Sequence, residues 1–208
     1  MKLFYRFWHT LFRVIFKVLY RHRVIGIENI PKGAAILASN HISYWDPPLV
    51  GTSCPQEIHY LARGSLFEQF GLGWIICNLN SHPVKGNAGD LKSIKMVCKL
   101  LREGQKVMIF PEGIRSWDGK LLPIKPGVSM IAQREHAPIV PVYLDGVFQV
   151  WPRTRRFPRL WGRTTCVFGK PIYPENYNHL TKRDAQLAIA KTLEESLQEL
   201  QDSCAKLS

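Results

Sequence analysis

The stretch "AAILASNHISYWDPP", residues 34–48, indicates how this chain is built and where its chemistry lies. It opens with an aliphatic run that ends in turn-forming residues, which is typical of a β-strand. His41 follows at the carboxyl end of this expected strand, the side on which open α/β sheets bind ligands. Pro47 suits the first turn of a helix. The stretch therefore predicts a strand, a turn and a helix, a building unit of α/β folds.

Similar runs recur along the chain and alternate with helical patterns. Strands are predicted at 24–27, 34–39, 58–62, 106–110, 139–144 and 164–169, and helices at 47–52, 72–78, 89–102 and 127–136. A long amphipathic helix is predicted at 181–205, with Thr181 as its N-cap. This alternation predicts one α/β domain, with a mixed, largely parallel sheet flanked by helices.

Composition describes a single globular domain with a strong basic excess. The chain has 208 residues, 46% of them hydrophobic, which is enough for one ordinary core. Lys and Arg number 28 against 16 Asp and Glu, a net charge of +12. This excess favours nucleic acid, an anionic membrane or phosphorylated small molecules as partners. The five cysteines are scattered without a C-x-x-C pair, so we expect reduced thiols in a cytoplasmic protein.

The first twenty residues are apolar and aromatic, but Arg6, Arg13 and Lys17 interrupt them. No run reaches the roughly 18–20 apolar residues of a membrane span, and no signal-peptide cleavage site follows. The polar positions recur at helical spacing, which predicts an amphipathic helix. Such a helix either packs in the core or lies in a membrane interface, and its broad apolar arc favours the interface. We therefore expect a membrane-associating helix over 1–22 and a globular domain over 23–208.

His41 and Asp46 stand five positions apart, so only an irregular turn can bring them together. In one interpretation Asp46 caps a helix and His41 is a satisfied polar group. In the other, Asp46 orients the imidazole and leaves its second nitrogen as a general base. The chain has no G-x-S-x-G or H-E-x-x-H motif. A histidine base here would therefore act on a hydroxyl of the substrate.

Two further stretches combine basic residues with aromatic ones. They are "IFPEGIRSWDGKLLPIKPG" at 109–127 and "WPRTRRFPRLWGR" at 151–163. The second holds five arginines among Trp151, Phe157, Leu160 and Trp161, a composition found in RNA-binding and membrane-binding segments and also in solvated loops.

Four motifs in order give the chain a family resemblance. They are NHISYWDPP at 40–48, FPEGIRS at 110–116, IKPG at 124–127 and IVPV at 139–142. In this order they resemble the glycerolipid acyltransferases, and most of all the bacterial branch that acylates lysophosphatidic acid. The resemblance implies transfer of an acyl group from acyl-CoA or acyl-carrier protein to the free hydroxyl of 1-acylglycerol 3-phosphate, which forms phosphatidic acid in phospholipid synthesis.

The resemblance also implies a role for particular residues. His41 would be the general base and Asp46 its support, without a covalent acyl-enzyme. Pro141 would line the acyl pocket. The residues implied around the acceptor are Lys85, Glu112, Gly113, Arg115, Ser116 and Lys125. Lys85 stands where the family usually has arginine, and Ile114 where it usually has threonine, so this chain departs from the family pattern at two positions.

The implied partners are the acyl donor, the lysophosphatidic acid acceptor and an anionic membrane surface, with no nucleic acid, metal or cofactor. The implied location is the cytoplasmic face of the cell membrane, as a peripheral or monotopic protein. Two alternatives remain open from the sequence. One is the same chemistry on glycerol 3-phosphate or another lysophospholipid, and the other is a non-catalytic basic module that binds membrane or RNA.

Overall fold

A seven-stranded, largely parallel sheet forms the centre of the computed structural model, which describes residues 3–84 and 91–206. The strands are β1 (Arg23–Ile25), β2 (Ala35–Ser39), β3 (Ile58–Arg63), β4 (Ser81–Val84), β5 (Lys106–Ile109), β6 (Ile139–Asp145) and β7 (Thr165–Phe168). Their order is β1-β7-β6-β2-β5-β3-β4. The β6–β7 pair is antiparallel and every other pair is parallel.

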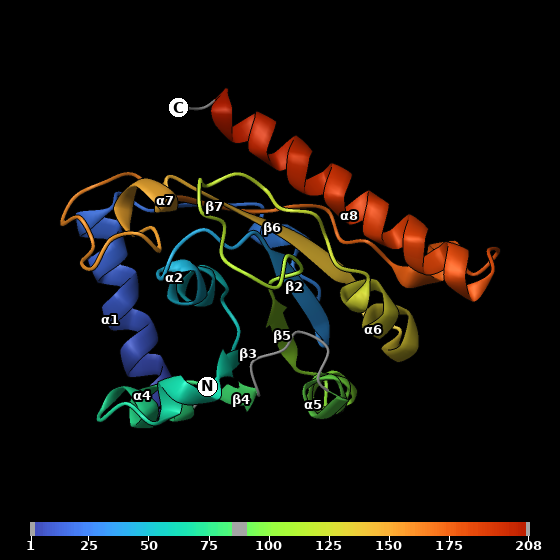
Figure 1. Cartoon of the computed structure of the whole chain (residues 1–208), viewed down its shortest axis with the longest axis horizontal. Helices are drawn as coiled ribbons and strands as arrows, with labels where there is room; N and C mark the ends of the chain where they lie inside the picture. The colour runs from blue at the N-terminus through green and yellow to red at the C-terminus, as the bar shows by residue number, and fades with distance from the viewer. Residues whose placement is uncertain (1–2, 85–90, 207–208) are drawn as a thin grey trace.

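Helices cover both faces of the sheet and give a three-layer arrangement (Figure 1). The helices are α1 (Leu3–Leu19), α2 (Asp46–Ser53), α3 (Gly64–Phe67), α4 (Leu72–Asn78), α5 (Leu91–Arg102), α6 (Gly127–Glu135), α7 (Val147–Val150) and α8 (Lys182–Ala205). Two 3₁₀ turns lie at Ile27–Asn29 and Pro174–Tyr177. Helices α1, α2 and α7 pack on one face, while α5, α6 and α8 pack on the other.

Strand β2 shows why both faces are covered. All five of its residues are buried, and successive side chains of a strand point to opposite faces. Leu37 joins the cluster beneath α1 and α2, whereas Ile36 and Ala38 join the cluster beneath α5, α6 and α8. A strand that is apolar on both sides stays in the middle of a sheet, so its carboxyl end is held rigidly from two directions.

The predicted fold class is confirmed, and each of the six predicted strands is present within a residue or two. The strand that sequence reasoning missed is β4, whose sequence Ser-His-Pro-Val contains a proline and only one aliphatic residue. Proline is tolerated there because β4 is an edge strand. The short helices α3 and α7 were also missed. The helix predicted at 89–102 is described from Leu91 onward, and residues 89–90 lie outside the described part.

Helix α1 has two apolar surfaces rather than one. Its inner side packs against α2, and Phe16 is fully buried in the core cluster on that face. Its outer side exposes a stripe made of Leu3, Phe7, Leu11, Val14 and Val18. Among the described residues, no helix is both long and apolar enough to cross a bilayer. A separate membrane-associating unit over residues 1–22 stays a prediction.

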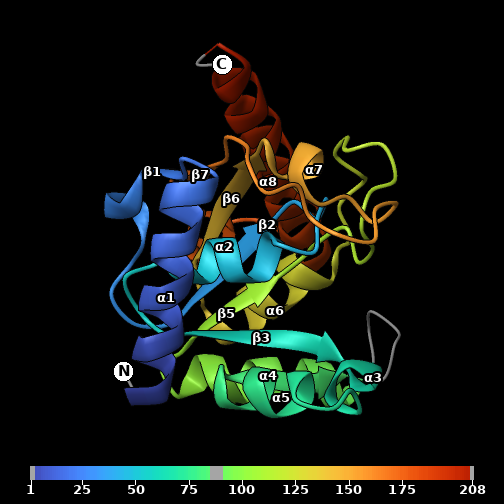
Figure 2. The same ribbon diagram turned by 90° about the vertical axis from the view of Figure 1, so that its left-hand side faces the viewer.

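Seen from the side that faces the viewer in Figure 2, α1 lies in front of α2, while α3 and α4 lie below. Ring contacts tie these parts together, since Phe4 meets Trp74 of α4 with ring centroids 5.0 Å apart. Phe12 and Phe16 both contact Trp45, which directly precedes α2. The amino-terminal helix thus braces the segment that follows β2.

Candidate active site

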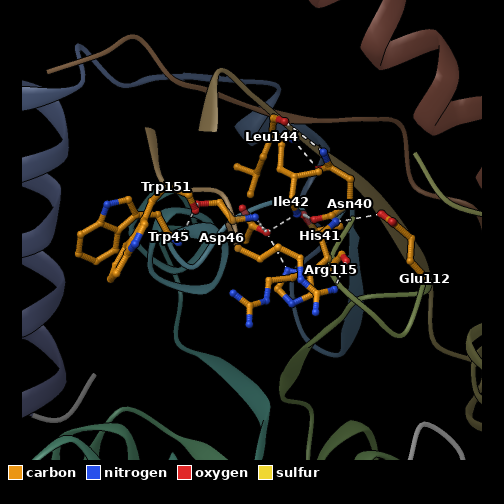
Figure 3. Close-up of polar contacts among 12 residues, drawn as sticks. Asn40, His41, Ile42, Trp45, Asp46, Glu112, Arg115, Leu144 and Trp151 are labelled. Carbon is orange, nitrogen blue, oxygen red and sulfur yellow. Dashed lines mark hydrogen bonds and ion pairs between the residues drawn. The ribbon is translucent and has the colours of Figure 1, made fainter. Parts of the chain in front are cut away.

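The turn after β2 brings an imidazole and a carboxylate into contact, as the sequence predicted (Figure 3). The Nδ1 atom of His41 lies 2.7 Å from the Oδ2 atom of Asp46. The same oxygen accepts hydrogen bonds from the backbone N–H groups of Ile42, at 2.7 Å, and Ser43, at 2.8 Å. One carboxylate oxygen therefore organises the whole irregular turn and fixes the ring of His41 to it.

Asp46 is not the cap of α2, so this alternative from the sequence is wrong. It is the first residue of the helix, and the capping position belongs to Trp45, which makes no capping hydrogen bond through its side chain. The carboxylate turns back toward the preceding residues instead. It is fully buried, and its Oδ1 atom has no hydrogen-bond partner among the described residues. A buried carboxylate held by three donors is suited to orienting a histidine.

His41 carries its proton on Nδ1, because a carboxylate oxygen can only accept. Burial lowers the pKa of His41 below its usual value, and the nearby charges of Arg115 and Arg63 act in the same direction. Asp46 opposes them and raises that pKa. The ring also stacks on Phe110, with centroids 3.7 Å apart and an angle of 14° between the planes. At neutral pH the ring is thus neutral, with the lone pair of Nε2 available.

The FPEGIRS segment, which follows β5, holds the backbone of His41 from the other side. The N–H of His41 donates to Oε1 of Glu112 at 2.9 Å, and the N–H of Ser116 donates to the carbonyl of His41 at 2.8 Å. The other oxygen of Glu112 accepts from the N–H of Leu122 at 3.3 Å. Burial raises the pKa of Glu112 to about 7. Figure 3 shows Asp46 and Glu112 on opposite sides of His41.

Three cationic groups gather around this turn. The guanidinium of Arg115 stacks on the ring of Tyr44, 3.7 Å from its centroid, and its Nη1 atom is buried without a partner among the described residues. Arg63 is the last residue of β3, and its positive charge lies close enough to His41 to lower the pKa of the imidazole. Lys125 lies against Gly113, where a Cβ atom would fall 2.7 Å from the Nζ atom of the lysine. Gly113 has φ +76°, a backbone conformation that favours glycine, and the absence of a Cβ atom leaves room for the end of the Lys125 side chain.

The start of the 151–163 loop forms a third part of the site. The hydroxyl of Ser43 donates to the carbonyl of Trp151 at 2.7 Å, and the N–H of Tyr44 donates to the same oxygen at 3.2 Å. Arg153 donates from Nη1 to the carbonyl of Arg115 at 3.0 Å and lies 3.4 Å over the ring of Trp117. Three segments that are distant in the chain therefore hold one another around His41.

With this geometry in place, comparison with known proteins decides the family. Residues 21–145 match the family described as Acyltransferase, a span that contains His41, Asp46 and Arg115. The chain belongs to the acyltransferase family. The resemblance drawn from the four motifs is confirmed, and family membership places the chain among enzymes.

The similarity between this acyltransferase and its relatives covers different fractions of the relatives' own length. It is 28% identical over 205 residues to a 1-acyl-sn-glycerol-3-phosphate acyltransferase of Bacillus subtilis, covering 98% of this chain and 100% of that protein. A chloroplastic enzyme of the same name from Brassica napus is 29% identical over 158 residues, which are 74% of this chain but 46% of the plant protein.

A solved structure shares the fold of the acyltransferase. The 1-acyl-sn-glycerophosphate (LPA) acyltransferase PlsC of Thermotoga maritima superposes with a TM-score of 0.76 at 26% identity. The match covers 95% of this chain and 78% of that one.

Sequence reasoning missed three residues of the acyltransferase site. Asn40 is buried, and its side chain donates to the carbonyl of Leu144 and accepts from the N–H of Leu144, which fastens the turn to β6. Arg153 supports the backbone of Arg115. Arg63 was missed although a signal was available. It directly follows the strand predicted at 58–62, and His41 likewise follows the carboxyl end of its strand.

Two predicted site residues of the acyltransferase stay predictions. Lys85 lies outside the described residues. Pro141 is buried within β6, in register with Ala38 of β2, and its place in an acyl pocket stays a prediction. Behind the site, a small cavity lies between the segment 121–124 and α8, and it is also lined by Glu112, Glu194, Leu197 and Gln198.

Proposed function

We propose that this acyltransferase moves an acyl group from acyl-CoA or acyl-carrier protein to the free hydroxyl of 1-acylglycerol 3-phosphate, and so makes phosphatidic acid. The observation that carries this proposal is the 2.7 Å contact between His41 Nδ1 and Asp46, beside a buried guanidinium nitrogen of Arg115 that lacks a partner among the described residues. A base and an anion-binding group stand next to each other, as an acceptor with both a hydroxyl and a phosphate requires.

The proposed reaction uses His41 twice. Its Nε2 atom takes the proton of the acceptor hydroxyl as that oxygen attacks the carbonyl carbon of the thioester. The new C–O bond gives a tetrahedral intermediate, which collapses when the C–S bond breaks. The departing thiolate takes the proton back from the imidazolium and leaves as a free thiol. Asp46 stabilises the imidazolium between these two steps.

The serines nearest the base support direct transfer, without an acyl-enzyme. The hydroxyl of Ser43 is already given to the carbonyl of Trp151, and that of Ser116 to the carboxylate of Asp118 at 3.0 Å. Both hydroxyls also accept hydrogen bonds, from the N–H groups of Trp45 and Gly119 respectively. Neither is directed at His41 Nε2, the atom that would have to activate a serine nucleophile.

The phosphate of the acceptor would lie against Arg115, with Arg63 and Lys125 adding positive charge. A guanidinium donates a fork of two N–H groups that matches two phosphate oxygens. Stacking on Tyr44 fixes the plane of the Arg115 guanidinium before substrate binds. Glu112 would not compete for this group, because its two oxygens are occupied by backbone N–H groups of His41 and Leu122.

The proposed place of action is the membrane surface, on its cytoplasmic face. The acceptor is a lipid, and the outer stripe of α1 leaves five large apolar side chains uncovered. An exposed apolar stripe with basic neighbours such as Arg13 and Lys17 suits a peripheral position in the interface. The inner side of the same helix supports the turn that carries His41, through Trp45.

The test is release of free thiol from acyl-CoA by the purified protein. We expect release with lysophosphatidic acid and much slower release with glycerol 3-phosphate or with a lysophospholipid of larger head group. His41→Ala is the control for contaminating activity. Equal or faster release with glycerol 3-phosphate would replace the proposed acceptor while leaving the chemistry in place. No release with either acceptor, from acyl-CoA or from acyl-carrier protein, would refute the proposal.

A further inference from the structure

The loop 151–163, which we name the arginine loop, exposes three large apolar side chains in succession. Phe157, Leu160 and Trp161 are 68%, 69% and 68% accessible to solvent. Single exposed apolar residues are ordinary on a protein surface, but three within five residues on one loop are not. Since the base of this loop is fixed by Trp151 and Arg153, its apolar tip is presented on a firm support.

The charge of the arginine loop is also of one sign. Arg156, Arg159 and Arg163 are exposed, and among the described residues none of the three forms an ion pair. The sequence from 146 to 174 contains no aspartate or glutamate. The loop therefore offers guanidinium groups without an internal counter-charge, and it suits a partner that is anionic.

Backbone contacts place the arginine loop beside the carboxyl end of α1. The N–H of Gly162 donates to the carbonyl of Leu19 at 3.2 Å, and the hydroxyl of Tyr20 donates to the carbonyl of Arg159 at 2.9 Å. In Figure 1 the loop and α1 project from the same side of the molecule, opposite α8. The carboxyl end of α1 and the arginine loop thus lie together on one side of the protein.

We propose that the arginine loop is a second membrane-contact site, which inserts its apolar tip into the interface of an anionic bilayer while its arginines bind lipid phosphates. An anionic bilayer fits better than nucleic acid or the acyl donor because it supplies both an apolar phase and a negative surface. The proposal builds on the membrane-bound acceptor of the proposed function. It is tested by vesicle binding, which needs no turnover, so the two can fail separately.

The first variant, the triple variant, removes the apolar tip by combining Phe157→Ser, Leu160→Ser and Trp161→Ser. The second, the charge variant, removes two positive charges by combining Arg156→Gln and Arg159→Gln. Binding is measured by co-sedimentation with vesicles of phosphatidylglycerol and phosphatidylcholine, and with phosphatidylcholine alone. We expect each variant to bind the anionic vesicles about tenfold less tightly than the natural chain, with residual binding through α1. The charge variant should also show a weaker dependence on salt.

Matched controls come from the far side of the sheet. Leu180→Ser with Leu187→Ser removes exposed apolar surface near and on α8, and Lys182→Gln with Arg183→Gln removes exposed charge there. Both control proteins should bind vesicles like the natural chain. Equal losses in the control proteins would mean that only overall charge or hydrophobicity matters, and would overturn the assignment to this loop.

Kinetics in detergent micelles separate the membrane from the donor as occupant. For both loop variants we expect an unchanged KM for acyl-CoA and an unchanged thermal midpoint. Unaltered vesicle binding by the two variants would refute the inference, whatever their activity. A raised KM for acyl-CoA together with normal vesicle binding would assign the loop to the donor instead. The charge variant removes no apolar side chain, so it remains informative even where the triple variant folds poorly.

Discussion

Two opposing influences set the pKa of His41. Replacing one carboxylate oxygen of Asp46 by an amide nitrogen, in Asp46→Asn, separates them. Burial lowers the pKa of His41 and Asp46 raises it. Below its pKa the imidazole is protonated and cannot act as a base, so kcat/KM should fall as pH drops through a value under 6.5. In Asp46→Asn the raising influence is lost, and this acid limb should move to still lower pH.

The same substitution should reduce kcat by about 10² or more, because an amide keeps the hydrogen bonds of the turn but does not stabilise an imidazolium. His41→Ala should cost about 10² to 10⁴. The measurement is a pH–rate profile of both variants and the natural chain. Near-normal turnover of Asp46→Asn, with an unmoved acid limb, would show that Asp46 only shapes the turn.

Arg115 should bind the acceptor rather than the donor. Arg115→Ala should raise the KM for lysophosphatidic acid by about tenfold or more, because a charge-assisted contact to phosphate is lost. Arg115→Lys should restore only part of this loss, since charge returns without the planar fork. Lys120→Ala, which removes a largely exposed cation of the same segment, is the control. Equal effects on the KM values of donor and acceptor would place the phosphate elsewhere.

At the scale of residues, the sequence predicted pairs that are close along the chain and missed those that are not. His41 and Asp46 were recognised because five positions and two prolines define a turn. Arg63 and Arg153 were not assigned a role, because their distance from His41 depends on the order of strands in the sheet. The interpretation of Asp46 as a helix cap, one of two left open, was wrong because its carboxylate meets the N–H groups of the preceding turn, which spacing alone does not show.

At the scale of elements, the two surfaces of α1 predict two different kinds of variant. Phe7→Ser, Val14→Ser and Val18→Ser together should weaken vesicle binding while the thermal midpoint stays unchanged, because these side chains are mostly exposed. Phe16→Ala should lower the free energy of unfolding by about 3–5 kcal/mol, because this ring is fully buried. Circular dichroism during urea unfolding and vesicle co-sedimentation measure the two effects. The interpretation is wrong when the outer variant unfolds as readily as Phe16→Ala.

Elements with a strong internal pattern were predicted well and those without one were not. The boundaries of α4 match the prediction, and α8 begins after Thr181, whose hydroxyl accepts from the N–H of Asp184 as expected. Strand β4 has too few aliphatic residues to be recognised from its sequence. It is a strand because its backbone pairs with β3. For α1, the broad apolar arc favoured a membrane interface, without showing that part of this arc, including Phe16, packs in the core.

For the molecule as a whole, His22 predicts sensitivity to acid. Its ring bonds both Thr164 and Ser53, at 2.8 Å each, and burial lowers its pKa to about 4. The unfolded chain, with an ordinary value near 6.5, therefore binds more protons than the folded chain between these two values. Above pH 6.5 the ring is neutral in both the folded and the unfolded chain, so it does not change the free energy of unfolding. As pH falls from 6.5 toward 4, the free energy of unfolding decreases.

This loss should be on the order of 3 kcal/mol, and His22→Gln should show a smaller fall over the same pH range. Glu112 changes the free energy of unfolding in the opposite direction. Its pKa is raised to about 7, so the folded chain binds its proton more readily than the unfolded chain and is favoured as pH falls. Comparing His22→Gln with the natural chain removes that common contribution. Parallel curves of unfolding free energy against pH, measured in urea, would rule out His22 as the source.

Whole-molecule properties were partly predictable as well. The net charge of +12 indicated anionic partners, but only the structure shows that α1 and the arginine loop project on the same side. Assembly of the site from the segments after β2, after β5 and after α7 could not be read from the sequence, because it depends on β2 lying between β5 and β6.

The turn after β2 is joined to the base of the arginine loop through Ser43 and Tyr44, and it leads into α2, which packs against α1 (Figure 2). An acceptor held in the bilayer would then reach His41 by lateral diffusion, without crossing water. The rate would follow the mole fraction of lysophosphatidic acid within the membrane, not its amount per volume of solution. Diluting the acceptor with inert phospholipid, at a constant total quantity of acceptor, should slow the reaction in the manner of surface-dilution kinetics.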